Sequence, residues 1–488
     1  MQDDESQRNG DEQSGQRTTS SRTVPPQKTA PRPSRRRSAL ARRDLTKGSI
    51  RNHVWYLGWP QVAEGFLGVI DQVADLVWAG RLGFHAIAGL GASQAYLSTI
   101  MMARMGLDSS MRSMIARAVG ARQLAQANHV LVQSFLLTSV LAVVMIAVGL
   151  FLAEPLLRLI GMSDAAVEQG TGYMQVQLIA MACLSYHRLF GGALQASGDS
   201  ITPLKAALVS RVIHIVLSPI LIFGWLGFPS LGLTGAAFAR LAAEIFGVGM
   251  TYWALRSGRG RISLRFREFR IDFPLIWSLL RQGAPASVTN MQRGVSQLVV
   301  VGVAAQFGDV ALAAFALARR AENVVNQSSR GMGRAAGALA GQNLGAELTE
   351  RARSAVRWGM LIGFGMAAPA LVLLIAFPEP IAGFFNSDAD FIRISSTWLV
   401  IASIGYIFMC PVQILTQAFN TSGSTFAPMV ITVATMWAFE IPLTFILANF
   451  SPLGHLGIPA AIVGGMGLRL VAFTWYYFRG TWLRTGLM

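Results

Sequence analysis

Apolar and polar residues occur in long separate blocks along this chain. After about residue 53, apolar stretches of about 20 to 25 residues recur, and short connections separate them. A helix needs about 20 apolar residues to cross the hydrocarbon core of a bilayer, so each stretch predicts one membrane-spanning helix. The predicted spans are 54–80, 86–111, 127–151, 172–195, 203–225, 231–254, 274–304, 309–337, 355–377, 395–418, 427–448 and 457–478. The predicted fold class is therefore an all-α polytopic membrane protein with twelve transmembrane helices.

The composition excludes most soluble classes of protein. Of the 488 residues, 52% are hydrophobic and 14% are charged, whereas soluble proteins carry about 25% charged residues. Cys183 and Cys410 lie far apart in apolar segments, which predicts buried thiols rather than a disulfide or a zinc site. The chain contains no Walker loop, GxSxG elbow or HExxH motif, so neither an ATP-driven pump nor a hydrolase is indicated. We expect no enzyme activity, no metal and no cofactor beyond a coupling ion.

Basic residues are concentrated in the tail and in alternate connections. Residues 1–53 are polar, become rich in Pro, Ser and Arg, and lack the apolar core of a signal peptide, which predicts a disordered tail. The linker 255–273 holds six arginines, whereas the connections 226–230, 305–308 and 449–456 hold no Lys or Arg. Because cytoplasmic connections carry the excess of Lys and Arg, we predict cytoplasmic termini in a plasma or inner membrane. The net charge of +16 then reports topology, and no nucleic-acid partner is expected.

An internal repeat emerges when the chain is shifted by 225 residues against itself. Eight features coincide at this one offset, among them Pro60 with Pro285, Gly106 with Gly331, Glu154-Pro155 with Glu379-Pro380, and Ser197-Gly198 with Ser422-Gly423. The repeat predicts two six-helix bundles, 54–254 and 274–488, joined by the linker 255–273. Because six is even, the bundles have the same orientation, with a pseudo-twofold axis along the membrane normal and a substrate site between them. We expect the linker to carry the hinge and the protein to be a monomer.

The first span contains three carboxylates at Glu64, Asp71 and Asp75. Steps of seven and eleven residues return to within about 20° on a helix, so all three lie on one stripe. A charge in mid-membrane costs about 2.5–3.5 kcal/mol, which forbids a lipid-facing stripe. The carboxylates either pair with bases on neighbouring helices or form a cation or proton site; like charges in a low dielectric favour proton uptake. Pro60 predicts a bend in this helix, either static or linked to coupling.

Candidate partners for these acids lie on the fifth and sixth spans. Arg211, His214 and Ser218 are three and four residues apart and share one helix face, as do Arg240 and Glu244. Together with the first span they predict a nearly balanced buried network. Arg240 and Glu244 could instead satisfy each other, and His214 could be an ordinary hydrogen-bonded core residue.

The second copy carries different polar groups at matching depth. A candidate substrate cavity is formed by Asn290, Gln292, Glu322, Asn326, Gln413 and Gln417. Ordinary interhelical hydrogen bonding is the alternative role for most of them. Near the cytoplasmic end of the second span, Arg104, Asp108 and Arg112 are four residues apart on one face, and they predict either a gate or a surface ion ladder.

Taken together, the ordered motifs resemble the multidrug and toxic compound extrusion (MATE) family over essentially all of the chain after residue 50. The end of that family's first helix is similar to DLVWAGRLG at residues 75–83. Its paired loops after helices two and eight are similar to ARAVGAR at 116–122 and GQNLGAE at 341–347. Its loop after helix four is similar to LQASGDSITP at 194–203, and the start of its helix six to GLTGAAFA at 232–239.

The resemblance implies an antiporter that exports small cationic or amphipathic organic compounds in exchange for protons or sodium ions. Asp75 matches the first-helix Asp of the DNA-damage-inducible-protein-like branch, which implies a coupling role. His214 and Ser218 stand where that branch has Asn and Asp, and Arg240 stands at a position that often holds Thr. A lost carboxylate and a fixed positive charge disfavour a sodium site, so we predict proton coupling. Other hypotheses are a sodium-coupled exporter, a flippase of lipid-linked sugars, and a non-transporting receptor or scaffold.

Overall fold

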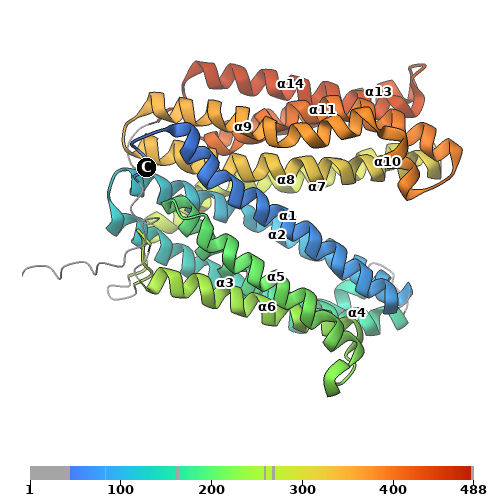
Figure 1. Cartoon of the computed structure of the whole chain (residues 1–488), viewed down its shortest axis with the longest axis horizontal. Coiled ribbons are helices and arrows are strands. Elements are labelled where there is room, and N and C mark those ends of the chain that lie inside the picture. The colour runs from blue at the N-terminus through green and yellow to red at the C-terminus, as the bar shows by residue number, and fades with distance from the viewer. Residues whose placement is uncertain (1–43, 83, 160–163, 258–259, 266–269, 485–488) are drawn as a thin grey trace, which may run out of the picture. The chain divides into compact units, whose positions relative to one another are not determined.

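The computed structural model describes residues 44–82, 84–159, 164–257, 260–265 and 270–484, and within these ranges it contains helices and connections but no β-strand. The first copy contains α1 (Ile50–Leu82), α2 (Phe84–Gly120), α3 (Leu124–Leu159), α4 (Asp164–Ser197), α5 (Ile201–Phe223) and α6 (Gly232–Arg256). The second contains α7 (Phe273–Ala305), α8 (Asp309–Gly345), α9 (Thr349–Ala376), α10 (Pro378–Phe385), α11 (Ala389–Thr421), α12 (Phe426–Ala434), α13 (Ile441–Asn449) and α14 (Gly457–Arg479). A π-helical segment, Thr435–Glu440, joins α12 to α13 without a break. The described chain thus holds twelve long helical segments, which confirms the predicted fold class (Figure 1).

Seven of the long segments in the described chain are apolar enough to cross a membrane by length and composition: α3, α5, α6, α9, α11, α12 to α13, and α14. The remaining long helices are more polar: α1, α2, α4, α7 and α8. Four of these five face one another between the bundles, since α1 packs on α8 and α2 packs on both α7 and α8. Polar residues that would be costly against lipid are therefore gathered where the two bundles meet.

The chain is ordered before the start predicted for the first bundle. The Asp44 carboxylate accepts a hydrogen bond from Thr46 N at 3.0 Å, and Leu45 is fully buried. Helix α1 begins at Ile50, and its first turns place Val54 and Leu57 in the hydrophobic core of the second bundle. The prediction of a disordered tail is thus wrong for residues 44–53, because apolar side chains there find a core to enter; residues 1–43 lie outside the described chain.

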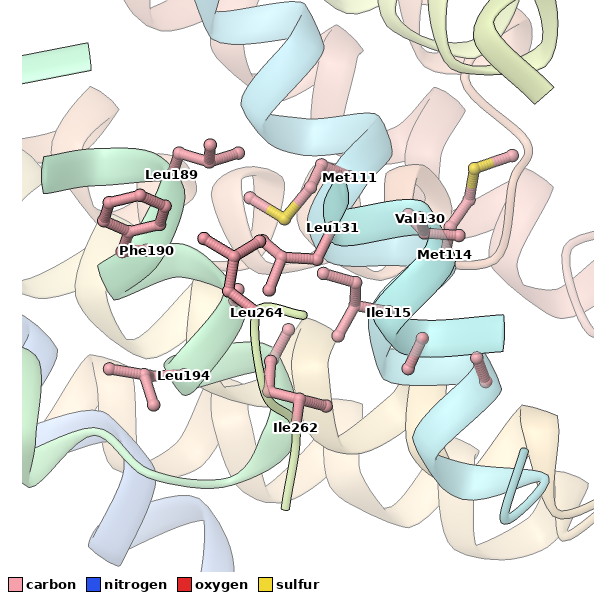
Figure 2. Packing of buried hydrophobic residues seen from close by; sticks show 14 of the residues in the cluster. Met111, Met114, Ile115, Val130, Leu131, Leu189, Phe190, Leu194, Ile262 and Leu264 are labelled. Atoms are coloured by element: carbon pink, nitrogen blue, oxygen red, sulfur yellow. The ribbon is translucent and has the colours of Figure 1, made fainter. Parts of the chain in front are cut away.

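The linker is packed against the first bundle. Ile262 and Leu264 are buried among side chains of α2, α3 and α4, including Met111, Leu131 and Phe190 (Figure 2). Between them, Ser263 N donates a hydrogen bond to Asn128 Oδ1 on α3 at 2.8 Å. The hinge that we expected in the linker therefore does not lie at residues 262–264, which are fixed to the first bundle.

The two bundles interlock at the end where α2 and α8 terminate and the linker lies, called here the linker end. A Cβ on Gly120 would lie 1.9 Å from the carbonyl oxygen of Gln342, and a Cβ on Gly345 would lie 2.1 Å from that of Arg117. Gly345 and Gln342 are the equivalents of Gly120 and Arg117 at the offset of 225, so the same contact occurs twice. Gln342 Nε2 also donates to the carbonyl of Ala196 at 2.7 Å. The linker end is closed by backbone contacts that only glycine permits.

Candidate functional site

Asp71 is the centre of a buried charge network in the first bundle. Its side chain is 1% exposed. Oδ1 lies 2.6 Å from His214 Nδ1 on α5, while Oδ2 accepts from Arg211 Nη1 at 2.8 Å and lies 3.2 Å from Arg240 Nη1 on α6. One carboxylate on α1 is therefore held by three cationic or titratable side chains from two other helices.

Asp75 shares two of these partners. Its Oδ2 accepts from Arg240 Nη1 at 3.2 Å, and its Oδ1 lies 3.4 Å from His214 Nε2, an ion-pair distance without hydrogen-bond geometry. His214 thus stands between the two carboxylates with one ring nitrogen toward each, and Arg240 bridges them with one nitrogen. Both acids therefore face the same imidazole and the same guanidinium.

Glu244 on α6 extends the network to α4. It is fully buried, its Oε2 lies 2.9 Å from His187 Nδ1, and its Oε1 lies 3.3 Å from Arg211 Nη1. The alternative that Arg240 and Glu244 satisfy each other is not observed, because Arg240 turns to the α1 acids instead. Arg211 therefore bridges Asp71 and Glu244.

Two residues predicted for this network lie apart from it. Glu64 accepts a hydrogen bond from Gln195 Nε2 on α4 at 2.8 Å, about two helical turns from Asp71. Ser218 is buried, and its Oγ has no hydrogen-bond partner within the described chain. Pro60 lies inside α1, which continues unbroken through it.

The six residues predicted to line a substrate cavity divide into several groups. Asn326 Oδ1 accepts from Gln413 Nε2 at 3.2 Å and from Arg330 Nε at 3.1 Å, which links α8 to α11. Glu322 pairs with Arg319 on its own helix. The hydrogen bonds of Asn326 link two helices, and the ion pair of Glu322 lies within one helix. These contacts leave the predicted substrate contact untested.

The other three predicted residues also find protein partners or a cavity. Asn290 donates to the carbonyl of Ala286 within α7 at 2.8 Å. Gln292 accepts from Trp437 Nε1 at 3.1 Å. Gln417 lines a cavity between the bundles, to which we return below.

Of the charged set predicted on α2, Arg104, Asp108 and Arg112, only the first two form an ion pair with each other. Arg104 pairs with Asp108 at 3.0 Å and donates to the carbonyl of Ser185 at 2.7 Å. Arg112 does not join them; it donates to Gln195 on α4. The side chain of Arg104 is 4% exposed, so its pair with Asp108 is not a surface ion ladder.

Several charged residues of the interior were missed in the sequence. Arg469 lies in a span whose other residues are mostly apolar, and this isolation was the available signal; for His187 the signal was the directly following Arg188 in the same span. Arg469 Nη2 pairs with Glu440 at 2.8 Å in the second bundle. Arg334 was likewise passed over, because it lies three residues from a predicted span boundary, and Arg188, seven residues inside its span, was passed over with its neighbour His187.

A twelve-helix protein with two parallel bundles and ionisable side chains buried between its helices belongs to the class of membrane transporters. The sequence profile of the MatE family matches residues 60–220 and again 285–446, two matches that begin 225 residues apart. The chain therefore belongs to the MATE family, is a transporter rather than an enzyme, and is a multi-pass membrane protein.

Individual relatives agree with this assignment. The chain is 26% identical to the probable multidrug resistance protein YoeA of Bacillus subtilis, covering 86% of this chain and 91% of that protein. It is 25% identical to an FAD transporter of Shewanella oneidensis, covering 76% of this chain and 82% of that protein. A crystal structure of a transporter of the MOP superfamily from Pyrococcus furiosus matches with a TM-score of 0.83 at 23% identity, over 90% of this chain and 98% of that one.

Proposed function

We propose that this protein is a proton-coupled antiporter that exports small amphipathic organic compounds. The observation that carries the proposal is the placement of His214 between Asp71 and Asp75, all three no more than 6% exposed. Imidazole is the side chain whose ordinary titration falls nearest physiological pH, and here it lies between two carboxylates. The relative YoeA, described as a probable multidrug resistance protein, supports export of organic compounds.

Helix α1 supplies a mechanical link from this network to the closed end. Asp71 and Asp75 tie its later half to α5 and α6, whereas Val54 and Leu57 fix its first turns in the core of the second bundle. A proton that neutralises one carboxylate weakens the tie to Arg240 and lets this half of α1 move relative to α6. Because the same helix enters both bundles, that movement reaches the linker end.

Proton coupling is favoured over sodium coupling by the position of Arg240. Its Nη1 lies 3.2 Å from an oxygen of Asp71 and 3.2 Å from an oxygen of Asp75. A sodium ion shared by the two carboxylates would occupy the place that this guanidinium already fills. The permanent charge of Arg240 repels a second cation there.

Orientation follows from the charged connections. The linker end carries Arg256, Arg261, Arg265 and Arg270, whereas the described connections at the opposite end, 224–231, 306–308 and 450–456, hold no Lys or Arg. By the positive-inside rule, the linker end and both termini lie on the cytoplasmic side of the cell membrane.

The test uses the purified protein in proteoliposomes with an imposed pH gradient. Wild type is expected to move a fluorescent organic substrate together with protons, and Asp75→Asn is expected to lose both signals while its melting temperature is kept. Asp390→Asn, in an exposed ion pair, is the matched control. Transport driven by a sodium gradient at constant pH, or unchanged coupling in Asp75→Asn, would refute the proposal.

A further inference from the structure

A cavity lies between the two bundles at the linker end, and its polar lining is cationic. It is lined by Ser109, Arg112, Gln195, Ala196, Arg334, Ala338, Gln417 and Thr421. These lining residues carry two guanidinium groups, two amides and two hydroxyls, and none of them carries a carboxylate. Arg112 comes from α2 of the first bundle and Arg334 from α8 of the second, so the cavity is shared by both bundles.

The hydrogen bonds of the two arginines leave donors free. Arg112 donates from Nη1 to the amide oxygen of Gln195, and Arg334 donates from Nη2 to the carbonyl of Gln61 at 3.2 Å. Neither forms an ion pair with another part of the described chain, and Arg334 Nε is buried without a partner. A guanidinium has five N–H donors arranged to hold two oxygens of one anion, so each group retains free donors. The cavity, about 20 Å³, has room for about one water in this closed arrangement, so a larger ligand requires the linker end to open.

The surrounding charges do not balance this pair. Arg112 is repelled by Arg334 and Arg104, and is attracted by Asp108 and Glu64. Arg188 on α4 interacts electrostatically with these same acids and arginines. Counted with Arg112 and Arg188 themselves, the arginines of this set thus outnumber its carboxylates. Asp108 is already engaged by Arg104, and Glu64 by Gln195.

We propose that Arg112 and Arg334 bind an anionic group, a carboxylate or a phosphate, of the transported organic compound. An anion between them would offset the repulsion that arises when the bundles close around it. The inference rests on the proposed function for its cargo, and it replaces the expectation of a cationic cargo with one that carries negative charge. Opening of the linker end would expose both guanidinium groups to the cytoplasm, from which such a compound would enter.

Binding to the purified full-length protein in detergent tests this site independently of transport. The probes are carboxyfluorescein, an organic anion, and rhodamine 6G, a related cation, each followed by fluorescence anisotropy. Arg112→Gln and Arg334→Gln are each expected to weaken carboxyfluorescein binding at least tenfold, with rhodamine 6G binding not weakened. Arg334→Lys, which keeps the charge, should lose less, and Arg393→Gln, in an exposed ion pair, should lose nothing. Equal affinity of wild type and both Gln variants for carboxyfluorescein would overturn the proposal for a free organic anion.

Two further measurements cover variants that fail to fold and the source of the anion. With wild type alone, inorganic pyrophosphate should displace carboxyfluorescein, whereas chloride at the same ionic strength should not; no displacement counts against the site. In a second arm, fluorescent phosphatidylglycerol is compared with fluorescent phosphatidylcholine. Preference for phosphatidylglycerol that depends on Arg112 and Arg334 would identify a lipid-borne anion. If Arg112→Gln and Arg334→Gln bind both carboxyfluorescein and phosphatidylglycerol as tightly as wild type does, the inference is refuted.

The two proposals fail in different ways. Arginine-dependent anion binding without proton-linked movement of any dye would refute the antiporter and leave the anion site. Proton-linked movement of rhodamine 6G, with no arginine-dependent anion binding, would refute the anion site and leave the antiporter.

Discussion

The two bundles share one fold but arrange their buried charges differently. In the first, Asp71, Asp75 and Glu244 share Arg211 and Arg240 between them; His214 lies between the two aspartates and His187 lies beside Glu244. In the second, Glu440 and Arg469 form a closed pair, and Arg469 Nε donates to Thr435 Oγ1 at 3.0 Å. Arg469 is the equivalent of Glu244 at the offset of 225, so the charge at that position is reversed.

The difference separates a switchable arrangement from a fixed one. When one acid of a shared network changes its charge, its arginine retains another acid as a partner, and the helices can rearrange without leaving a charge unpaired. A closed pair has no such second partner, and breaking it leaves a buried charge uncompensated. We therefore expect function to depend on the first bundle and stability to depend on the pair in the second.

The largest effect is expected from Arg469→Leu, which leaves Glu440 buried without its partner. We expect the free energy of unfolding to fall by about 3–5 kcal/mol, measured by thermal or denaturant unfolding in detergent. The double variant with Glu440→Gln should recover most of this loss. Loss of proton coupling without loss of stability in Arg469→Leu would instead place a coupling role in the second bundle.

Arg240→Gln removes the guanidinium that bridges Asp71 and Asp75. Two carboxylates then share fewer positive partners, and we expect one of them to stay protonated through the transport cycle. Proton-coupled transport should fall about 100-fold, equivalent to about 2.7 kcal/mol, in proteoliposome efflux assays. Arg240→Lys should restore part of the rate, and an unaltered rate in Arg240→Gln would contradict the shared network.

His187→Gln should have a smaller effect, because its ion pair in the described part of the chain is with Glu244, at the edge of the network. We expect about a tenfold loss of coupled transport, equivalent to about 1.4 kcal/mol, together with a shifted pH profile. His129→Gln, a surface histidine 3.0 Å from Asp272, is the matched control and should leave the profile in place. If His187→Gln, His129→Gln and wild type all show the same pH dependence of transport, His187 has no part in coupling.

The smallest effect concerns Asp272, which caps the start of α7 outside the membrane. The hydrogen bond from Leu275 N, followed by the interaction with His129, lowers the pKa of Asp272 below its ordinary value. A lowered pKa stabilises the folded protein above the unfolded pKa, and this contribution is lost as the pH falls through the folded value. Asp272→Ala should cost about 1 kcal/mol near neutral pH, as measured by thermal unfolding, and less at low pH. A loss that grew on acidification would show that Asp272 acts through something other than this cap.

The sequence was sufficient to predict the helices, because a bilayer imposes a length on every apolar stretch, and the repeat, because glycine and proline positions are preserved across the two copies. It also brought Asp71, Asp75, Arg211, His214 and Arg240 together, since charges inside a membrane must find partners. It could not assign Glu64, because helix periodicity places three acids on one stripe without showing that α1 passes from one bundle to the other.

The sequence also could not predict which acid each buried arginine pairs with. Arg240 and Glu244 are four residues apart on α6, which favours a local pair, yet tertiary packing offers Arg240 two closer acids on α1. Only the three-dimensional contacts decide between partners of the same charge.

The paired glycine contacts at the linker end also have an evolutionary consequence. Gly120 meets the backbone at Gln342 while its equivalent Gly345 meets the backbone at Arg117, the reciprocal pattern of an isologous dimer. A single chain holds two separately encoded copies of this contact, so one substitution alters only one of them. The two halves already differ at its far side, where Arg117 stands at one position and Gln342 at its equivalent.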